Sequence, residues 1–222
     1  MNMIKNFLFD LDNTIYPSSA LINEGIDRRM IEAVSEFLSI DMETAAKMRS
    51  EKKKHYSSTL EWLMKERNLG DIGWYLRKVH PENEVEELCP VEGLKEFFAS
   101  LKERAYGMAI LTNGPAFHAQ RVLDFYGISE FFSGIHGIEE NHFHGKPYES
   151  AYRAALEKEN FVLEETVFVD DYPKYVAGYM RLGGTAVLID DEKKIADYEF
   201  PAFGKLYTLY SIFGLENILR YI

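Results

Sequence analysis

The sequence predicts an α/β protein with a Rossmann-like parallel sheet that is interrupted by an all-helical insertion. Apolar runs of strand length alternate with segments of helical periodicity, an order typical of parallel strands joined by right-handed helical crossovers. Between the first two apolar runs, every periodic segment is helical. We therefore expect a core domain of residues 1–17 and 89–222, with a helical domain of residues 18–88 inserted after the first strand.

The expected strands are short and apolar, and each ends at turn residues or acids. They cover residues 4–9, 106–112, 134–138, 167–169 and 185–189. Helices of the core are expected over residues 91–103, 115–127, 147–158 and 174–182, with a last one near 215–219. We expect the tail that begins at Asp190 to pack against an edge of the sheet.

The insertion contains helix signals of two kinds. Apolar residues recur at helical spacing over residues 22–37, and a short further helix is expected over 71–79. Asp41 is placed to cap a second helix, and Ser58 with Glu61 fits a capping box that opens a third.

The composition is that of an ordinary globular protein and limits the partners. The 222 residues carry a net charge of −11, which argues against nucleic acid or an anionic membrane as a partner. One cysteine excludes an intramolecular disulfide, and no apolar run approaches the length of a membrane span. The first residues lack the pattern of a secretory signal, so we expect a cytoplasmic protein.

Two acids end the first apolar run. Side chains two positions apart in an extended segment point the same way, so Asp10 and Asp12 should converge at the carboxyl end of the first strand. Neighbouring carboxylates are hard oxygen ligands of the kind that Mg²⁺ prefers. The alternative is an acidic turn without a metal.

Polar residues also follow later strands or precede a helix of the core. They are Asp10 and Asp12, Thr112 and Asn113, Lys146, and Asp170 and Asp171. In this order they resemble the four motifs of the haloacid dehalogenase (HAD) superfamily of hydrolases. The resemblance extends over residues 4–190, and the helical insertion matches what that superfamily calls a C1 cap.

The resemblance implies a role for each motif residue. Asp10 would be the nucleophile that forms an aspartyl-phosphate, and Asp12 the acid that protonates the leaving alkoxide and then activates water. Thr112 and the backbone amide of Asn113 would hold the phosphoryl oxygens, and Lys146 would offset the negative charge.

The same resemblance implies a Mg²⁺ site. Its ligands would be Asp171, the carboxylate of Asp10 and the main-chain carbonyl of Asp12, with Asp170 as an auxiliary ligand. Many relatives carry a further Asp or Asn at the place of Tyr175, which cannot act as a carboxylate ligand. That departure leaves the metal affinity in question.

The substrate is expected to be a small phosphorylated metabolite, bound by a monomer or a small homo-oligomer. Asp12 argues against a dehalogenase, whose halide leaving group needs no proton. Residues 12–17 resemble the opening of pyrimidine 5′-nucleotidase-like members, so a pyrimidine nucleoside 5′-monophosphate is one candidate, with Tyr16 as a substrate-binding residue that stacks on the base or packs structurally. The alternatives are a sugar-phosphate or phosphoglycolate-type phosphatase, or a HAD-fold binding or regulatory protein with little turnover.

Three further signals have simpler interpretations. His136, His142 and His144 lie close in sequence, but they lack the spacing of a zinc site and are read as solvated loop residues. His118 follows the second motif and is expected to have a surface or packing role, with an orientation toward the substrate as the alternative. Arg49 with Lys52–Lys54 is read as a solvated face, with attraction of an anionic substrate as the alternative.

Overall fold

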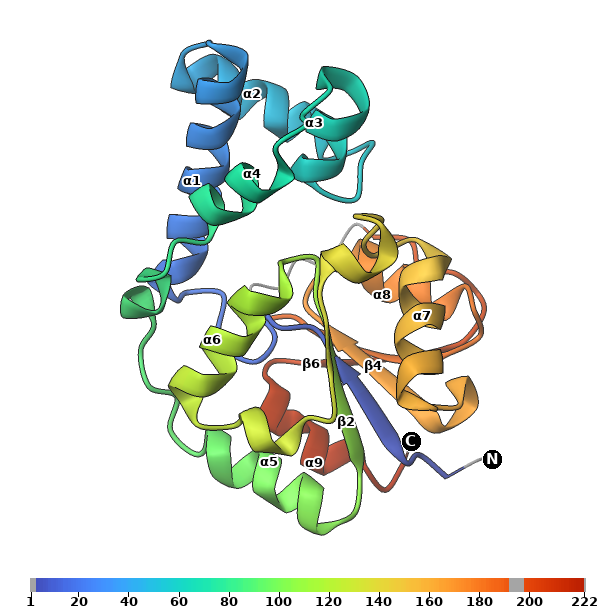
Figure 1. Ribbon diagram of the computed structural model, residues 1–222. Helices are drawn as coiled ribbons and strands as arrows, with labels where there is room; N and C mark the ends of the chain where they lie inside the picture. The colour runs from blue at the N-terminus through green and yellow to red at the C-terminus, as the bar shows by residue number, and fades with distance from the viewer. Residues whose placement is uncertain (1–2, 192–197, 222) are drawn as a thin grey trace.

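The computed structural model describes residues 3–191 and 198–221, and its core is a six-stranded sheet between two layers of helices (Figure 1). The strands lie in the order β3-β2-β1-β4-β5-β6, and every neighbouring pair is parallel. This confirms the predicted α/β class with a parallel sheet. The strands are β1 (Asn6–Phe9), β2 (Gly107–Leu111), β3 (Ile135–His136), β4 (Thr166–Asp170), β5 (Thr185–Ile189) and β6 (Lys205–Leu209).

The register of the three central strands brings their carboxyl ends together. Phe9 of β1 lies beside Ile110 of β2 and Val169 of β4. The residues that follow in each strand therefore meet at one edge of the sheet, where open parallel sheets bind ligands.

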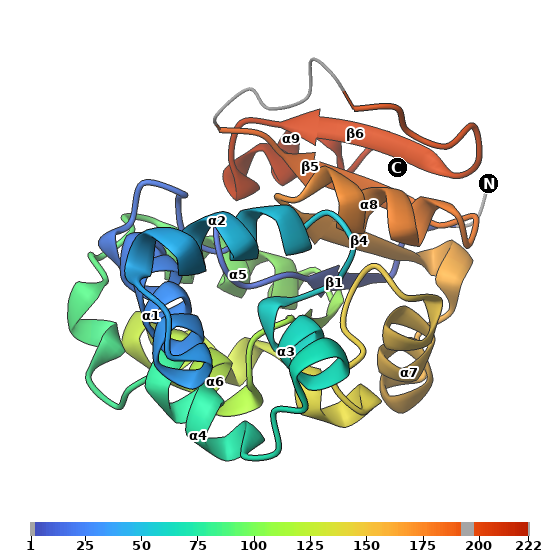
Figure 2. The same ribbon diagram turned by 90° about the horizontal axis from the view of Figure 1, so that it is seen from above.

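Helices cover both faces of the sheet because its strands are apolar on both sides. Phe9 packs against Phe98 on one face, with ring centroids 5.5 Å apart, whereas Phe168 packs against Tyr152 and Tyr179 on the other. The helices of the first face are α5 (Leu94–Glu103), α6 (Ala116–Tyr126) and α9 (Leu215–Ile218). Those of the second face are α7 (Glu149–Glu159) and α8 (Pro173–Met180), as Figure 2 shows from above.

The cap, which we define as residues 18–88, stands over the carboxyl ends of the strands (Figure 1). Residues 10–106 are all described and contain no strand, as predicted. The helices of the cap are α1 (Leu21–Leu38), α2 (Met42–Lys52), α3 (Thr59–Arg67) and α4 (Ile72–Val79), followed by the 3₁₀ turn η1 (Glu84–Glu87). Further 3₁₀ turns of the core are η2 (Ser129–Phe131), η3 (Ile138–Asn141), η4 (Leu163–Glu165) and η6 (Ile212–Gly214).

The predicted helix caps are present, one of them in altered form. Asp41 accepts a hydrogen bond from the backbone of Thr44, and Ser58 accepts one from the backbone of Glu61. The carboxylate of Glu61 does not return to Ser58, as a capping box requires, but accepts from the backbone N–H and hydroxyl of Ser57 at 2.7 and 2.6 Å. The box is therefore offset by one residue.

The tail packs against the sheet edge, as expected, but it does so as a sixth strand. β6 pairs with β5 from Thr185 opposite Lys205 to Ile189 opposite Leu209. Its side chains are only partly buried, so the segment lacks the continuous apolar run that marks the inner strands. Residues 192–197 of the predicted tail lie outside the described residues.

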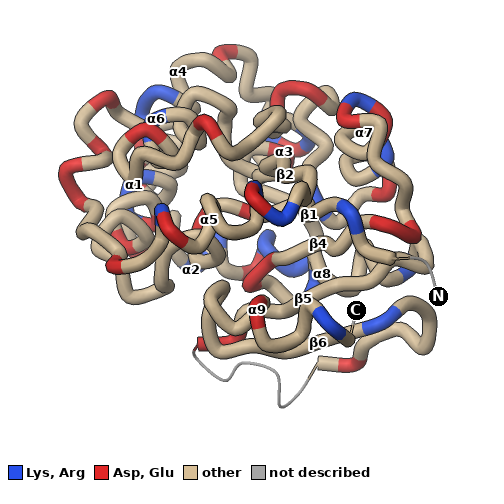
Figure 3. Tube along the Cα trace, turned by 90° about the horizontal axis from the view of Figure 1, so that it is seen from below, with Lys and Arg blue, Asp and Glu red and all other residues tan. Residues whose placement is uncertain are grey.

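Two further observations concern the surface. In the described part of the chain, no helix is both long and apolar enough to cross a membrane. Seen from below, acidic and basic residues are interspersed along the trace (Figure 3).

Candidate active site

A buried lysine joins the carboxylates at the ends of β1 and β4. The ammonium of Lys146, which is fully buried, donates to Asp10 at 2.5 Å and to Asp170 at 2.7 Å. Burial raises the pKa of Asp10 to about 7; Lys146 opposes this shift, and the nearby Asp170 and Asp12 add to it. At Asp10 the effect of burial therefore outweighs that of the Lys146 ammonium.

The loop that carries Lys146 is positioned by Asn113, which follows β2. The side-chain carbonyl of Asn113 accepts from the backbone N–H of Lys146 at 2.7 Å, and its amide donates to the Lys146 carbonyl at 2.9 Å. Gly145 permits this close approach, because a Cβ at that position would lie 2.2 Å from the Asn113 amide oxygen.

The turns after β1 and β2 present the other motif residues. Asn13 adopts a left-handed conformation with φ of 61°, which asparagine tolerates better than most residues and which turns the chain directly after Asp12. Thr112 is buried, and its hydroxyl accepts from the backbone N–H of Gly114 at 2.9 Å. Both turns therefore face the same edge of the sheet.

Asp12 is held by two donors that approach the same oxygen. Its Oδ1 accepts from the hydroxyl of Tyr16 and lies 3.0 Å from Nε2 of His118. Burial opposes ionisation of Asp12, but His118 and the hydrogen bonds from His118 and Tyr16 outweigh it and lower the pKa of Asp12 to about 2.

Tyr16 does not have the position that base stacking requires. Its side chain is fully buried and packs against Tyr126, with ring centroids 6.3 Å apart. Its hydroxyl is directed to Asp12 rather than into the cavity. Of the two readings of Tyr16, the geometry favours the structural one.

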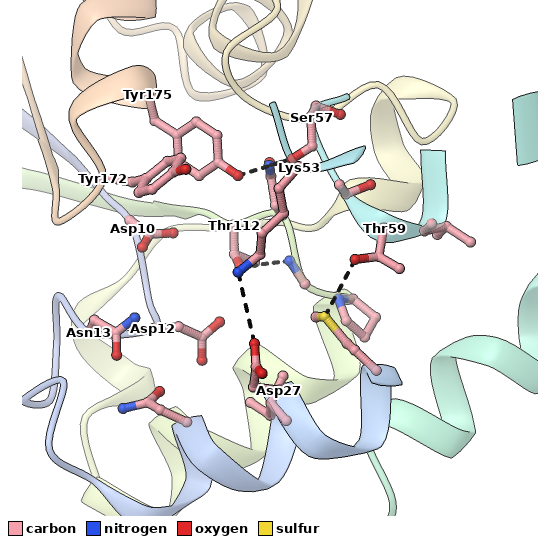
Figure 4. Close-up of a pocket in the computed structure, with 18 of the residues that line it drawn as sticks. Asp10, Asp12, Asn13, Asp27, Lys53, Ser57, Thr59, Thr112, Tyr172 and Tyr175 are labelled. Carbon is pink, nitrogen blue, oxygen red and sulfur yellow. Dashed lines mark hydrogen bonds and ion pairs between the residues drawn. The ribbon is translucent and has the colours of Figure 1, made fainter. Parts of the chain in front are cut away.

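A cavity of about 290 Å³ separates the strand ends from the cap (Figure 4). The core contributes Asp10, Asp12, Asn13, Thr112, Asn113 and Asp171 to its lining. The cap contributes mostly polar residues, among them Asp27, Lys53, Ser57, Ser58 and Thr59. A ligand bound at Asp10 would therefore meet hydrogen-bonding groups on both sides.

The basic cluster of the cap is not a uniform solvated face. Lys53 lines the cavity and lies 3.8 Å from Asp27, whereas Lys52 pairs with Glu66 on the exterior. Arg49 is buried and pairs with Asp27 at 2.7 Å.

Within the part of the chain that the structure describes, four hydrogen bonds hold the cap segment 56–61 against the core, the longest of them from the Asn113 amide to the Ser57 carbonyl at 3.5 Å. The hydroxyl of Tyr175 donates to the Ser57 carbonyl at 3.0 Å, and the ammonium of Lys174 donates to the Tyr56 carbonyl at 3.2 Å. The hydroxyl of Tyr148 donates to the carboxylate of Glu61 at 2.8 Å. Tyr175, which stands where relatives carry a carboxylate or amide, therefore contacts the cap, and Lys146 also lies 5.2 Å from its ring centroid.

Two groups of side chains in the described residues have ligand atoms close enough to share a metal ion. One is Asp10, Asp170 and Asp171, and the other is His80, Glu84 and His118; in both, the atoms lie within 4.8 Å of one another. Neither group contains His136, His142 or His144. His136 is buried between Glu140 and Glu159 at 2.8 Å from each, so it is not a solvated loop residue.

Sequence reasoning missed the surroundings of Asp12. His118 was expected at the surface or in packing; it is fully buried and contacts a motif residue. His80 and Glu84, also buried, were not singled out. Glu84 belongs to an acidic stretch, and nothing in the sequence separates it from its exposed neighbours.

Comparisons with known proteins agree with this arrangement. Residues 4–174 match a family model described as haloacid dehalogenase-like hydrolase. The chain is 27% identical to the glyceraldehyde 3-phosphate phosphatase of Methanocaldococcus jannaschii over 98% of both chains. It is 24% identical to phosphate metabolism protein 8 of Saccharomyces cerevisiae, over 89% of this chain and 64% of the yeast protein.

A solved structure has the same fold. The HAD phosphatase from Thermococcus onnurineus superimposes with a TM-score of 0.67 at 21% identity, over 97% of this chain and 98% of that one.

Proposed function

The chain belongs to the haloacid dehalogenase-like hydrolases and is a phosphatase of that family, and we propose that it hydrolyses small phosphomonoesters through a covalent phospho-Asp10. The observation that carries the proposal is the buried Lys146 bridge between Asp10 and Asp170, beside Asp12 and Thr112. It supports the proposal because the mechanism needs a carboxylate nucleophile, an acid and a cation at one edge of the sheet.

The reaction follows from these positions. An oxygen of Asp10 attacks phosphorus, and the bond between phosphorus and the ester oxygen breaks. Because the pKa of Asp12 is about 2, the proton that Asp12 passes to the departing alkoxide comes from the His118 imidazolium, whose pKa is raised to about 9 and whose Nε2 lies 3.0 Å from Asp12. In the second step Asp12 takes a proton from the water that attacks the aspartyl-phosphate and returns it to His118. Lys146 and the groups of Thr112 and Asn113 offset charge on the transferred phosphoryl oxygens.

We propose Mg²⁺ as the cofactor, held by Asp10, Asp170 and Asp171, with the main-chain carbonyl of Asp12 as a further ligand. The donor set supports this choice, because it consists of hard carboxylate oxygens within 4.8 Å of one another. Burial is the main cause of the raised pKa of Asp10, and a bound cation would lower that pKa. When bound, Mg²⁺ lets two anions approach each other and stabilises charge on the phosphoryl group.

The substrates are proposed to be small hydroxylated phosphate esters of the sugar-phosphate or triose-phosphate class. Support comes from the polar cap side of the cavity, which offers the Asp27 carboxylate, the Lys53 ammonium and the Ser58 and Thr59 hydroxyls. The name of the archaeal relative points the same way. The nucleoside 5′-monophosphate prediction loses its stacking residue, since Tyr16 is buried. It stays a prediction for the assay.

The test is phosphate release from sugar phosphates, triose phosphates, phosphoglycolate, nucleoside monophosphates and an aryl phosphate, each with Mg²⁺ and with a chelator. Asp10→Asn should abolish Mg²⁺-dependent release, whereas Asp124→Asn, which changes an exposed acid on α6, should leave it unchanged. Release that survives Asp10→Asn would contradict the covalent mechanism. A folded protein that releases phosphate from no compound would favour a binding or regulatory role, and a preference for nucleotides would overturn the substrate class.

A further inference from the structure

A chain of buried side chains connects Asp12 to His80, and both of these residues line the cavity. Nε2 of His118 lies 3.0 Å from Oδ1 of Asp12, and Nδ1 of the same ring lies 2.9 Å from Oε1 of Glu84. The other oxygen of Glu84 lies 2.9 Å from Nδ1 of His80. The side chains of His118 and Glu84 are both fully buried.

The members of this chain come from segments far apart in the sequence. His118 lies in the first turns of α6, whereas Glu84 begins η1, through which the cap returns to the core. Arg121 of α6 fastens this return, since its guanidinium donates to the carbonyl of Pro81 at 3.1 Å and lies 3.4 Å from Glu84. Glu84 is therefore fixed with respect to α6.

The two donors to Asp12 divide its carboxylate into an anchored and an available oxygen. Tyr16 and His118 both approach Oδ1, and no hydrogen bond to Oδ2 is found among the described residues. Oδ2 lies 3.9 Å from the position that a Cβ on Gly114 would take, so it is on the side of the turn after β2. A carboxylate held in this way presents one defined oxygen to a ligand in the cavity.

We propose that Glu84 and His118 are positioning residues for the acid: Glu84 orients the His118 ring, and His118 holds Oδ1 of Asp12 so that Oδ2 faces the leaving group. This inference rests on the proposed function, because it presupposes that Asp12 protonates the leaving alkoxide. Because Glu84 lies in η1, where the cap returns to the core, the cap would take part in positioning the acid Asp12.

The simpler alternative is that this buried cluster only docks the end of the cap on α6. The positioning role and the docking role predict different effects on the rates of substrates with different leaving groups. General acid catalysis contributes about 10²–10⁴ to rate when the leaving group is a basic alkoxide, and little when it departs as a stable phenolate. A docking defect would slow both reactions alike.

The experiment compares kcat/KM for 4-nitrophenyl phosphate and glycerol phosphate, since kcat/KM reports the steps up to departure of the leaving group. Glu84→Gln keeps the shape of the side chain but removes its charge. Glu87→Gln is the matched control, because Glu87 lies in the same turn η1 and pairs with the buried Arg29 at 2.8 Å instead of His118. Thermal melting of each variant verifies folding.

We expect Glu84→Gln to lower kcat/KM for glycerol phosphate at least about tenfold and for the aryl ester less than about threefold, with both values nearly unchanged in Glu87→Gln. His118→Asn should repeat the selective loss. The positioning role would be overturned if kcat/KM fell equally with both esters or did not fall. It would also be overturned if Glu84→Gln and His118→Asn both failed to fold.

Asp12→Asn separates this result from failure of the proposed function. If Asp12→Asn shows no selective loss with glycerol phosphate, the role of Asp12 itself is wrong. If Asp12→Asn shows the loss and Glu84→Gln does not, only the positioning inference fails.

Discussion

The buried ammonium of Lys146 offers a quantitative test of the site that does not depend on the substrate. Lys146→Met removes the cation between Asp10 and Asp170 and fills its space with an apolar chain of similar length. Both carboxylates stay buried, with exposed fractions of 6% for Asp10 and 0% for Asp170. Asp170 cannot reach water to replace the lost partner, and Asp10 can do so only on the side that lines the cavity.

The expected loss of stability is large. Removing one partner of a buried ion pair costs about 3–5 kcal/mol, a substantial share of the 5–15 kcal/mol that stabilises a typical domain. For a chain of this size, each kcal/mol lowers Tm by roughly 2–4 °C, so Tm should fall by about 6–20 °C. Lys47→Met is the control, because Lys47 pairs with Glu43 at 2.7 Å with both side chains exposed, and such pairs contribute at most about 1 kcal/mol.

The loss should also depend on pH. The pKa of Asp10 is raised from 3.8 to about 7 in the folded protein, so between these values the folded state binds more protons than the unfolded state. Stability from this group therefore declines as pH rises through that window. Without Lys146 the folded pKa values of Asp10 and Asp170 rise further, and the variant's deficit should be larger at pH 7.5 than at pH 5.5.

Urea denaturation of the wild type, Lys146→Met and Lys47→Met at the two pH values measures both effects. The reasoning is refuted if Lys146→Met costs less than about 1 kcal/mol at pH 7.5, or if its deficit is the same at both pH values. Either result would mean that the ammonium does not compensate two buried carboxylates in solution.

Two other variants test the cap. Tyr175→Phe keeps the aromatic ring near Lys146 but removes the hydrogen bond to the Ser57 carbonyl. Because such a bond contributes about 1 kcal/mol, amide hydrogen exchange over residues 56–61 should become about fivefold faster. Unchanged exchange would exclude a role of the Tyr175 hydroxyl in holding the cap. Lys53→Met should raise KM for a sugar phosphate by about tenfold or more without changing KM for an aryl phosphate, because charge-assisted hydrogen bonds contribute about 1.5–3 kcal/mol. Lys54→Met, next in sequence, is its control, and equal effects of the two lysines would indicate only a general electrostatic attraction.

The inner strands could be predicted because each is an apolar run of strand length that ends in turn residues or acids. β6 could not, because its side chains alternate between exposed and half-buried and its pairing with β5 joins segments separated by a long connection. Strand propensity alone does not identify such an edge; the neighbouring strand supplies the hydrogen bonds that decide it.

The motif residues were predictable for the same reason that the strands were: parallel strands in register bring their carboxyl ends together, so Asp10, Thr112 and Asp170 must be neighbours. The residues that hold the motif residues in place could not be predicted. Whether His118 faces solvent or Asp12 depends on how the end of the cap docks on α6, and this is a tertiary contact between residues 84 and 118. No local periodicity records it.

In the sequence, Tyr175 stands out because it cannot act as a carboxylate ligand; in the structure, it connects the core to the cap. Asp10, Asp170 and Asp171 have carboxylate oxygens within 4.8 Å of one another, so the proposed metal site does not need a carboxylate at position 175. The ring of Tyr175 packs against Lys146, and its hydroxyl donates to the Ser57 carbonyl of the cap.

The cap therefore contacts the core at segment 56–61, and separately through Glu84 and His118 where the cap returns to the core. If the first contact opens to admit substrate while the second stays closed, the acid remains aligned throughout the cycle. Variants at Tyr175 should then change KM, and those at Glu84 should change the discrimination between leaving groups.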